Sequence, residues 1–270
     1  MHVANIVNQV PEANLVAICD IRLDVAQAVA DKWGITRVVR DYHELLADES
    51  IEAVLIATTT STHAEIIKDC ANAGKHIFCE KPIALDLARI DEALEAVDRA
   101  GIKLQVGFNR RFDKSFQKVR EIVKSGELGR PCMLKITNRD PELPSKEFLR
   151  VSGGLFLDMT IHDFDMAQFQ IGEVTEVYAT GSVLIDNELE EFGDLDTALI
   201  TLKFKDGTIG SIDNSRQSVY GYDQRLEVFC LEGTAMAENE KENTVLKGNR
   251  EGFLSSRVPN FFMQRYAPCY

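Results

Sequence analysis

The first half of the chain alternates short apolar runs with stretches whose apolar residues recur at helical spacing. The apolar runs are typical of strands buried on both faces of a sheet, and they lie at residues 15–19, 53–57, 76–80 and 103–107. The helical stretches lie at residues 3–10, 23–33, 62–73 and 85–100, with a short one after Asp41-Tyr42. Pro11 follows the first of them and a glycine follows each of the other long ones, which predicts where they end. This alternation predicts an α/β domain with a doubly wound parallel sheet.

Beyond Gly107 the pattern changes to strands joined by short turns. A helix over 116–124 and a strand over 132–137 are predicted first, and further strands follow at 174–184, 197–204, 208–214, 226–231 and 235–238. Turn signals such as Lys205-Asp206-Gly207 are typical of an antiparallel sheet. We therefore expect domains at residues 1–110 and 111–270, the second an α+β domain with a mainly antiparallel open sheet. The acidic segment Asp186 to Asp196 is interpreted as a solvated loop.

The composition narrows the classes of function. The 270 residues, 45% hydrophobic and 27% charged, are those of a globular protein. A formal charge of −13 disfavours nucleic acid and anionic membranes as partners, and no apolar run approaches the ~20 residues of a membrane span. The six cysteines form no CxxC pair and the five histidines have no metal-binding spacing, so we expect reduced thiols in the cytoplasm and no metal site. A small-molecule ligand fits best.

Polar residues follow the predicted strands of the first domain, where parallel sheets bind ligands. Asp20 could accept hydrogen bonds from a ribose or simply cap the next helix. The run Thr58 to His63 offers hydroxyls and helix N-terminal amides to a polar ligand, and ordinary helix capping is the alternative. Lys81, between Glu80 and Pro82, ends an apolar strand and is expected to project from the sheet edge. A lysine partly withdrawn from water can exchange protons near neutrality, although a surface lysine is the alternative.

Asp158 and His162 are the sharpest candidates in the second domain. They lie four residues apart, after Gly153-Gly154 and within an apolar pattern of helical spacing, so a helix would place both on one face. A carboxylate beside an imidazole is suited to proton transfer, whereas a helix cap and a structural histidine are the alternative. Other polar clusters end predicted elements, and they contain Asn109, Arg110, Asn138, Asp140 and Tyr222.

Four motifs resemble the Gfo/Idh/MocA oxidoreductase family, most closely its inositol 2-dehydrogenase branch. They are EKPIALDL from Glu80, VGFNRRFD from Val106, GGLFLDMTIHDFDM from Gly153 and IDNSRQSVYGYDQRLEVF from Ile212. The resemblance implies a Rossmann-type domain followed by an α+β domain whose open sheet forms a homo-oligomer, a dimer or a tetramer. It also implies NAD as cofactor and a cyclic polyol or sugar as substrate.

The resemblance also implies a role for each matching residue. Lys81 would bond the substrate hydroxyl and share its proton, His162 would act as the base and Asp158 would assist it. Asp20 and Glu80 would accept hydrogen bonds from the two riboses of NAD. Further cofactor contacts are expected from Ile21, Thr58, Thr59, Ser61 and His63, and polyol contacts from Arg110, Asp140 and Tyr222.

The expected reaction is oxidation of myo-inositol to its 2-keto product, with the hydride passing to nicotinamide C4. A catalytically silent sugar-binding or oligomerisation protein is one alternative, and a dehydrogenase for another inositol or an aldose is a second. The sequence contains no GxGxxG. The family's first strand and its glycine-rich turn are expected to precede Met1, and the loss of that turn to weaken NAD binding. More structure is likewise expected after Tyr270.

Overall fold

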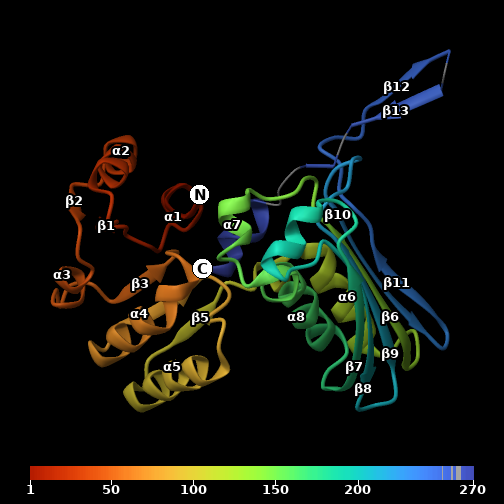
Figure 1. Ribbon diagram of the computed structural model, residues 1–270, viewed down its shortest axis with the longest axis horizontal. Helices are drawn as coiled ribbons and strands as arrows, with labels where there is room; N and C mark the ends of the chain where they lie inside the picture. Colours follow the sequence, from red (N-terminus) through yellow and green to blue (C-terminus); the bar gives the residue numbers. More distant parts are fainter. Residues whose placement is uncertain (251, 257, 260–262) are drawn as a thin grey trace. The chain divides into compact units, whose positions relative to one another are not determined.

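The computed structural model describes residues 1–250, 252–256, 258–259 and 263–270. The chain divides into two compact units (Figure 1). Unit 1 comprises Met1–Asn109 together with Gln264–Tyr270, and unit 2 comprises Arg110–Met263. Across the described ranges, every helix is too short or too polar to cross a membrane.

Unit 1 alternates strands and helices, as its apolar pattern predicts. The strands are β1 (Ala17–Cys19), β2 (Arg37–Val39), β3 (Ala53–Ile56), β4 (His76–Cys79) and β5 (Leu104–Val106). The helices are α1 (His2–Gln9), α2 (Leu23–Trp33), α3 (His43–Leu46), α4 (Thr60–Asn72) and α5 (Leu87–Ala100), with the short η5 (Ala267–Cys269). β2 was not expected from the sequence, because its three residues include an arginine and form no apolar run.

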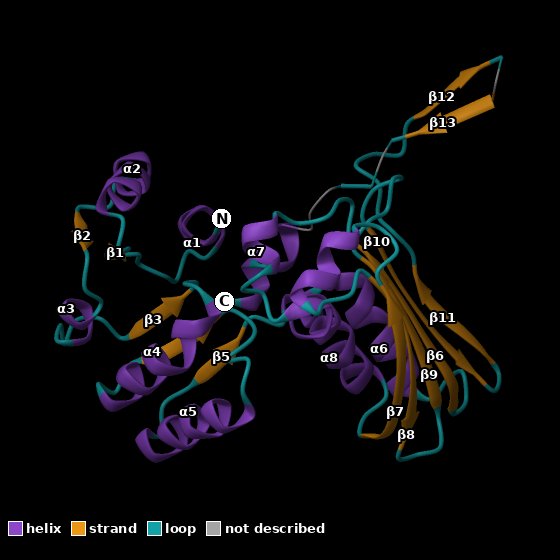
Figure 2. Cartoon of the chain, in the orientation of Figure 1, coloured by secondary structure: helices purple, strands orange, loops and turns teal. Residues whose placement is uncertain are grey.

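All strand pairs of unit 1 that the structure describes are parallel, which confirms the Rossmann-type fold. They form two hydrogen-bonded groups, β1–β2 and β3–β4–β5 (Figure 2). The single sheet expected from the sequence is thus present as two, because β1 and β3 are not paired with each other. The larger core of the unit lies between α4, α5 and β4. It contains Ile67 and Cys70 of α4, Ala93 and Val97 of α5, and Ile77 of β4.

Unit 2 is built around one six-stranded sheet of order β11-β10-β6-β9-β8-β7. The strands are β6 (Pro131–Arg139), β7 (Val174–Ser182), β8 (Thr197–Phe204), β9 (Ile209–Ser215), β10 (Asp223–Cys230) and β11 (Gly233–Ala237). Only the β6–β9 pair among these is parallel, so the mainly antiparallel sheet is confirmed. A separate hairpin, β12 (Leu246–Asn249) and β13 (Gly252–Ser255), was not expected from the sequence.

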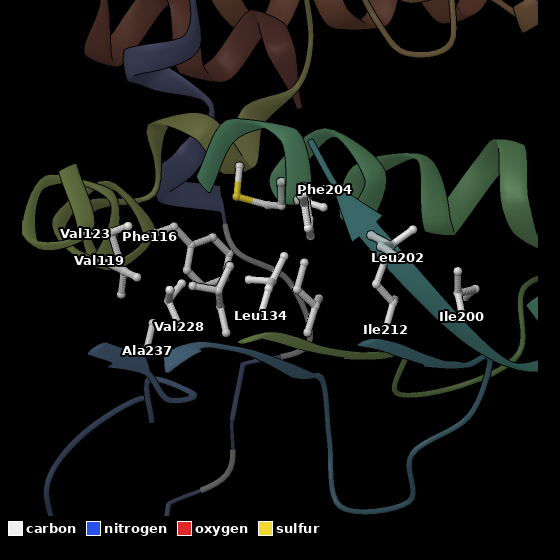
Figure 3. Packing of buried hydrophobic residues seen from close by; sticks show 14 of the residues in the cluster. Phe116, Val119, Val123, Leu134, Ile200, Leu202, Phe204, Ile212, Val228 and Ala237 are labelled. Atoms are coloured by element: carbon white, nitrogen blue, oxygen red, sulfur yellow. The ribbon is translucent and has the colours of Figure 1, made fainter. Parts of the chain in front are cut away.

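Two helices of unit 2, α6 (Lys114–Ser125) and α8 (Ile161–Gln170), cover one face of this sheet. The unit also contains α7 (Lys146–Leu149), the π-helical turn η2 (Phe156–Thr160) and the 3-10 turn η3 (Asn187–Phe192). The 3-10 turns η1 (Asn109–Phe112) and η4 (Met263–Arg265) span the points where the chain passes between the two units. Along β8, Ile200, Leu202 and Phe204 point into the core while the residues between them are exposed. Figure 3 shows these side chains in the same buried cluster as Phe116 and Val119 of α6. Burial of this apolar face is the main force that holds the unit together.

The acidic segment of unit 2 is only partly the solvated loop predicted from its charge, because Glu188, Glu190 and Glu191 are exposed but other residues are not. Residues 187–192 form η3, and Leu189 within it is buried. Asp196 has no exposed surface, and its carboxylate accepts hydrogen bonds from the backbone N–H groups of Leu184, Ile185 and Asp186. Burial raises the pKa of Asp196, but these backbone donors outweigh it and hold the pKa below its usual value. The Asp196 carboxylate thus holds the backbone of residues 184–186 in place by hydrogen bonds.

Candidate active site

The end of β1 carries the first predicted cofactor residues. Oδ1 of Asp20 accepts a hydrogen bond of 2.8 Å from the backbone N–H of Arg22, the residue that precedes α2. This hydrogen bond is the one expected if Asp20 caps the start of α2. It uses only Oδ1, so Oδ2 of Asp20 can accept a hydrogen bond from another donor. The Ile21 side chain is 76% exposed. Both residues are therefore accessible to a ligand, and their roles stay predictions.

The end of β3 and the start of α4 carry a group of hydroxyls. Thr58, Thr59 and Ser61 are exposed, and the hydroxyls of Thr58 and Thr62 lie 2.7 Å apart. His63 differs, because it is 1% exposed and its two ring nitrogens lie 2.8 Å from the Pro82 carbonyl and 3.1 Å from the Thr58 carbonyl. Its side chain thus ties together the loops that follow β3 and β4, and any effect on a ligand would act through those loops.

Glu80 and Lys81 follow β4 in the predicted position. Burial raises the pKa of Glu80, and the positive charge of Lys81 acts against that rise. A Cβ on Gly107 would lie only 3.0 Å from the Glu80 carboxylate, so the glycine leaves the room that Glu80 occupies. Lys81 is half-buried.

The polar groups of unit 1 fit a dinucleotide. Exposed hydroxyls stand at the N-terminus of α4, a helix of 13 residues, and Asp20 offers a carboxylate oxygen at the end of β1. Hydroxyls, helix N-terminal amides and a carboxylate are the groups that bind the phosphates and riboses of a nucleotide.

In unit 2, Asp158 and His162 lie on one continuous helical segment. Asp158 is in the π-helical turn η2 and His162 is in the first turn of α8. The helix expected there is therefore present, although its first turn is wider than the α-helix predicted. Gly153 and Gly154 precede it with φ of +86° and +83°, a conformation that favours glycine. Such π-helical turns are frequent at functional sites.

Asp140 and Tyr222 belong to the same group of side chains. The Tyr222 hydroxyl is hydrogen-bonded to Asp140, which follows β6. Burial raises the pKa of Asp140, while Tyr222 and the guanidinium groups of Arg216 and Arg110 lower it and the Asp158 carboxylate raises it. Four residues predicted from the sequence thus gather with Arg216, which was not predicted.

Arg110 is held by a buried network that the sequence did not reveal. Its NH1 donates to Oδ1 of Asp163 at 2.5 Å, and the side chains of Asn138 and Asn214 donate to Oδ2 at 2.8 and 2.9 Å. Asp163 has no exposed surface and Arg110 is 4% exposed. The predicted contact of Arg110 with a polyol stays a prediction, and the structure adds a structural role.

Comparison with known proteins agrees with this architecture. Residues 1–108 match the family model for the NAD-binding Rossmann fold of an oxidoreductase family, and residues 116–236 match the GFO/IDH/MocA C-terminal domain. The chain belongs to the GFO/IDH/MocA oxidoreductase family. This membership confirms the resemblance in the motifs, the expected oxidoreductase class and NAD as the cofactor.

Individual members of the family resemble the chain over nearly its whole length. A myo-inositol 2-dehydrogenase of Thermotoga maritima is 48% identical, over 100% of this chain and 81% of that protein. An inositol 2-dehydrogenase of Rhizobium meliloti is 44% identical, over 96% of this chain and 78% of that protein. The structure of scyllo-inositol dehydrogenase from Lactobacillus casei with bound NAD(H) and scyllo-inositol matches with a TM-score of 0.90 and 29% identity, over 99% of this chain and 82% of that one.

Proposed function

We propose that the protein oxidises a hydroxyl group of a cyclic polyol with NAD, and that its substrate is myo-inositol, converted to the 2-keto product. The named activities of the Thermotoga and Rhizobium relatives support the substrate class. The observation that carries the proposal is the group formed by Asp140, Asp158 and Tyr222 in unit 2. Carboxylates and a phenol are suited to the many hydroxyls of a polyol ring. The six free cysteines support a cytoplasmic location.

In this proposal the protein's own groups move the proton. His162 takes the proton of the reacting hydroxyl, and Asp158 orients the imidazole. Lys81 donates a hydrogen bond to the same oxygen and stabilises the charge that develops there. NAD, when bound, accepts the hydride.

The remaining residues hold the two ligands. Arg110, Asp140 and Tyr222 bind the ring hydroxyls. The cofactor is bound by Asp20, Ile21, Thr58, Thr59, Ser61 and Glu80, and His63 contributes through the loops that it holds together. A carboxylate at Asp20 would repel a 2′-phosphate, so NAD is preferred to NADP.

The test is reduction of NAD, followed by absorbance, with myo-inositol, scyllo-inositol and glucose in parallel. His162→Ala and Lys81→Ala should abolish turnover, whereas His43→Ala and Lys205→Ala, whose side chains are 60% and 71% exposed, should not. Failure to oxidise any cyclic polyol, or full activity of His162→Ala, would refute the proposal. Calorimetry that detected inositol binding without NAD binding would favour a sugar-binding protein instead.

We also propose that two copies associate through the outer face of the six-stranded sheet. Phe229, Met133 and Ile209 are neighbours across β10, β6 and β9, and each side chain is about half exposed. An apolar row of this kind is typical of an interface. Ile209→Lys should dissociate the oligomer in sedimentation experiments, whereas Leu87→Lys, at an exposed position of α5 in unit 1, should not. A wild-type monomer would contradict the proposal.

A further inference from the structure

Arg216 is a fully buried charged side chain that contacts Asp158 of the proposed catalytic pair. It follows β9 directly, and its side chain has no exposed surface. Its NH1 donates a hydrogen bond of 3.0 Å to Oδ2 of Asp158, and its NH2 lies 3.8 Å from Oδ2 of Asp194. A guanidinium group stays protonated in proteins, so this position holds a permanent positive charge.

The burial of this charge requires compensation by neighbouring groups. Burying an unpaired charge destabilises a protein by roughly several kcal/mol. Among the described residues, Nε and NH2 of Arg216 have no hydrogen-bond acceptor. The hydrogen bond to Asp158 is therefore the main contact that offsets the burial, and it fixes the Asp158 carboxylate in return.

Asp194 connects the same arginine to the start of the helical segment. Its Oδ1 accepts a hydrogen bond of 2.8 Å from the backbone N–H of Leu155, three residues before Asp158. A Cβ on Gly154 would lie 2.8 Å from that oxygen, so only glycine leaves room for it. The backbone N–H of Arg216 also donates to the carbonyl of Asp196 at 2.8 Å. The acidic segment, the end of β9 and the segment with Asp158 are thus joined around one guanidinium.

Arg216 also lies near the second carboxylate of the site. Its charge lowers the pKa of Asp140, on which Asp158 acts in the opposite direction. Two carboxylates this close repel each other, and a buried positive charge beside both offsets the repulsion.

We propose that Arg216 is a positioning residue of the dehydrogenase site, which holds the Asp158 carboxylate in the orientation that His162 requires. The inference rests on the proposed function for its catalytic consequence. Its geometric part, that Arg216 sets the position of Asp158, does not depend on turnover.

The first arm of the test measures turnover. Arg216→Ala should lower kcat by about 100-fold with little change in KM, because misplacement of a catalytic group costs about that factor. Arg216→Lys keeps the charge but not the planar fork, so its kcat should lie between those of the wild type and of Arg216→Ala. Millimolar guanidinium should restore turnover to Arg216→Ala by filling the space. Arg120→Ala is the control, since it removes a guanidinium that stacks on Phe169, and guanidinium should leave it unchanged.

The second arm needs neither NAD nor turnover. The carboxyl resonance of Asp158 can be followed in protein labelled with carbon-13 aspartate and assigned with Asp158→Asn. It should shift in Arg216→Ala and Arg216→Lys and return in Arg216→Ala when guanidinium is added. If the wild type lacks activity, the proposed function fails and this arm alone decides the inference. An unshifted resonance, or wild-type kcat in Arg216→Ala, would overturn it. Should Arg216→Ala not fold, Arg216→Lys still supplies both measurements.

Discussion

Asp163 offers the sharpest test of how unit 2 is held together. Its carboxylate has no exposed surface and accepts hydrogen bonds from Arg110, Asn138 and Asn214. Burial raises the pKa of Asp163, and the Arg110 guanidinium and the two amide donors act against that rise. Asp163→Ala removes the acceptor and leaves the guanidinium of Arg110, itself 4% exposed, without its partner.

The expected cost follows from the burial of both partners. Removing one partner of a buried ion pair costs about 3–5 kcal/mol. At roughly 2–4 °C per kcal/mol for a domain of this size, the melting temperature of unit 2 should fall by roughly 6–20 °C. Asp165→Ala is a matched control two residues later in α8, because it breaks a pair with Arg111, whose side chain is 43% exposed. That change should cost about 1 kcal/mol or less.

The assay must separate the two units. Hydrogen exchange of the amides in β8 and β9 under native conditions reports on unit 2, while fluorescence of Trp33, the single tryptophan, reports on unit 1. We expect Asp163→Ala to accelerate exchange in the sheet and to leave the urea midpoint of Trp33 unchanged. Equal losses in Asp163→Ala and Asp165→Ala would refute the reasoning, because burial would then not set the cost. Replacing Arg110 by Met and Asp163 by Leu together should recover the part of the loss that comes from the unpaired guanidinium, while Asn138 and Asn214 still lack their acceptor.

Three further predictions test the local geometry. Gly154→Ala should destabilise unit 2 by about 1–3 kcal/mol in urea, because the backbone needs positive φ and the added Cβ meets Asp194; an unchanged midpoint would argue against this strain. His63→Leu should destabilise unit 1 by about 1–3 kcal/mol, read from Trp33 fluorescence, because it removes the ring N–H that donates to one of the two buried backbone carbonyls beside it. Hydrogen bonds from a neighbouring serine and arginine lower the pKa of Asp48 to about 2, so its stabilisation is complete above its unfolded value near 4 and is lost as the pH falls toward 2. Asp48→Asn should remove this part of the pH dependence, and an identical acid profile would contradict it.

The elements of the fold could be predicted wherever the apolar pattern was continuous. The helix Leu23–Trp33 and the strand Thr197–Phe204 have the predicted bounds, because apolar spacing and a flanking glycine or turn fix both ends. The strand Arg37–Val39 and the hairpin over 246–255 could not be predicted, since their exposed or mixed positions have no period. The acidic segment was predicted correctly for its exposed glutamates and wrongly for Asp196, because side-chain charge says nothing of the backbone donors that surround that carboxylate.

The candidate site also contains features that the sequence could predict and features that it could not. The helical placement of Asp158 and His162 could be predicted from a four-residue spacing after two glycines, whereas their catalytic role comes from the family resemblance and stays a prediction. Arg216 had a local signal as well, because it continues the inward row of β9 formed by Ile212 and Asn214 at every second position. Its partners could not be predicted, since Asp158 and Asp194 come from segments far away in the sequence.

The buried charges of unit 2 explain how a strongly acidic protein can build an acidic site. The Asp158 carboxylate raises the pKa of Asp140, and the chain carries a formal charge of −13. Arg216 and Arg110 supply the compensating charge, and both are nearly or fully buried, so salt in the solvent screens them little. Oxygen acceptors of this kind are what a hydroxyl-rich ring requires, and the arginines allow several to lie together. Because surface charges are screened at ionic strengths that leave buried pairs intact, binding of a neutral polyol at this site should depend only weakly on salt concentration.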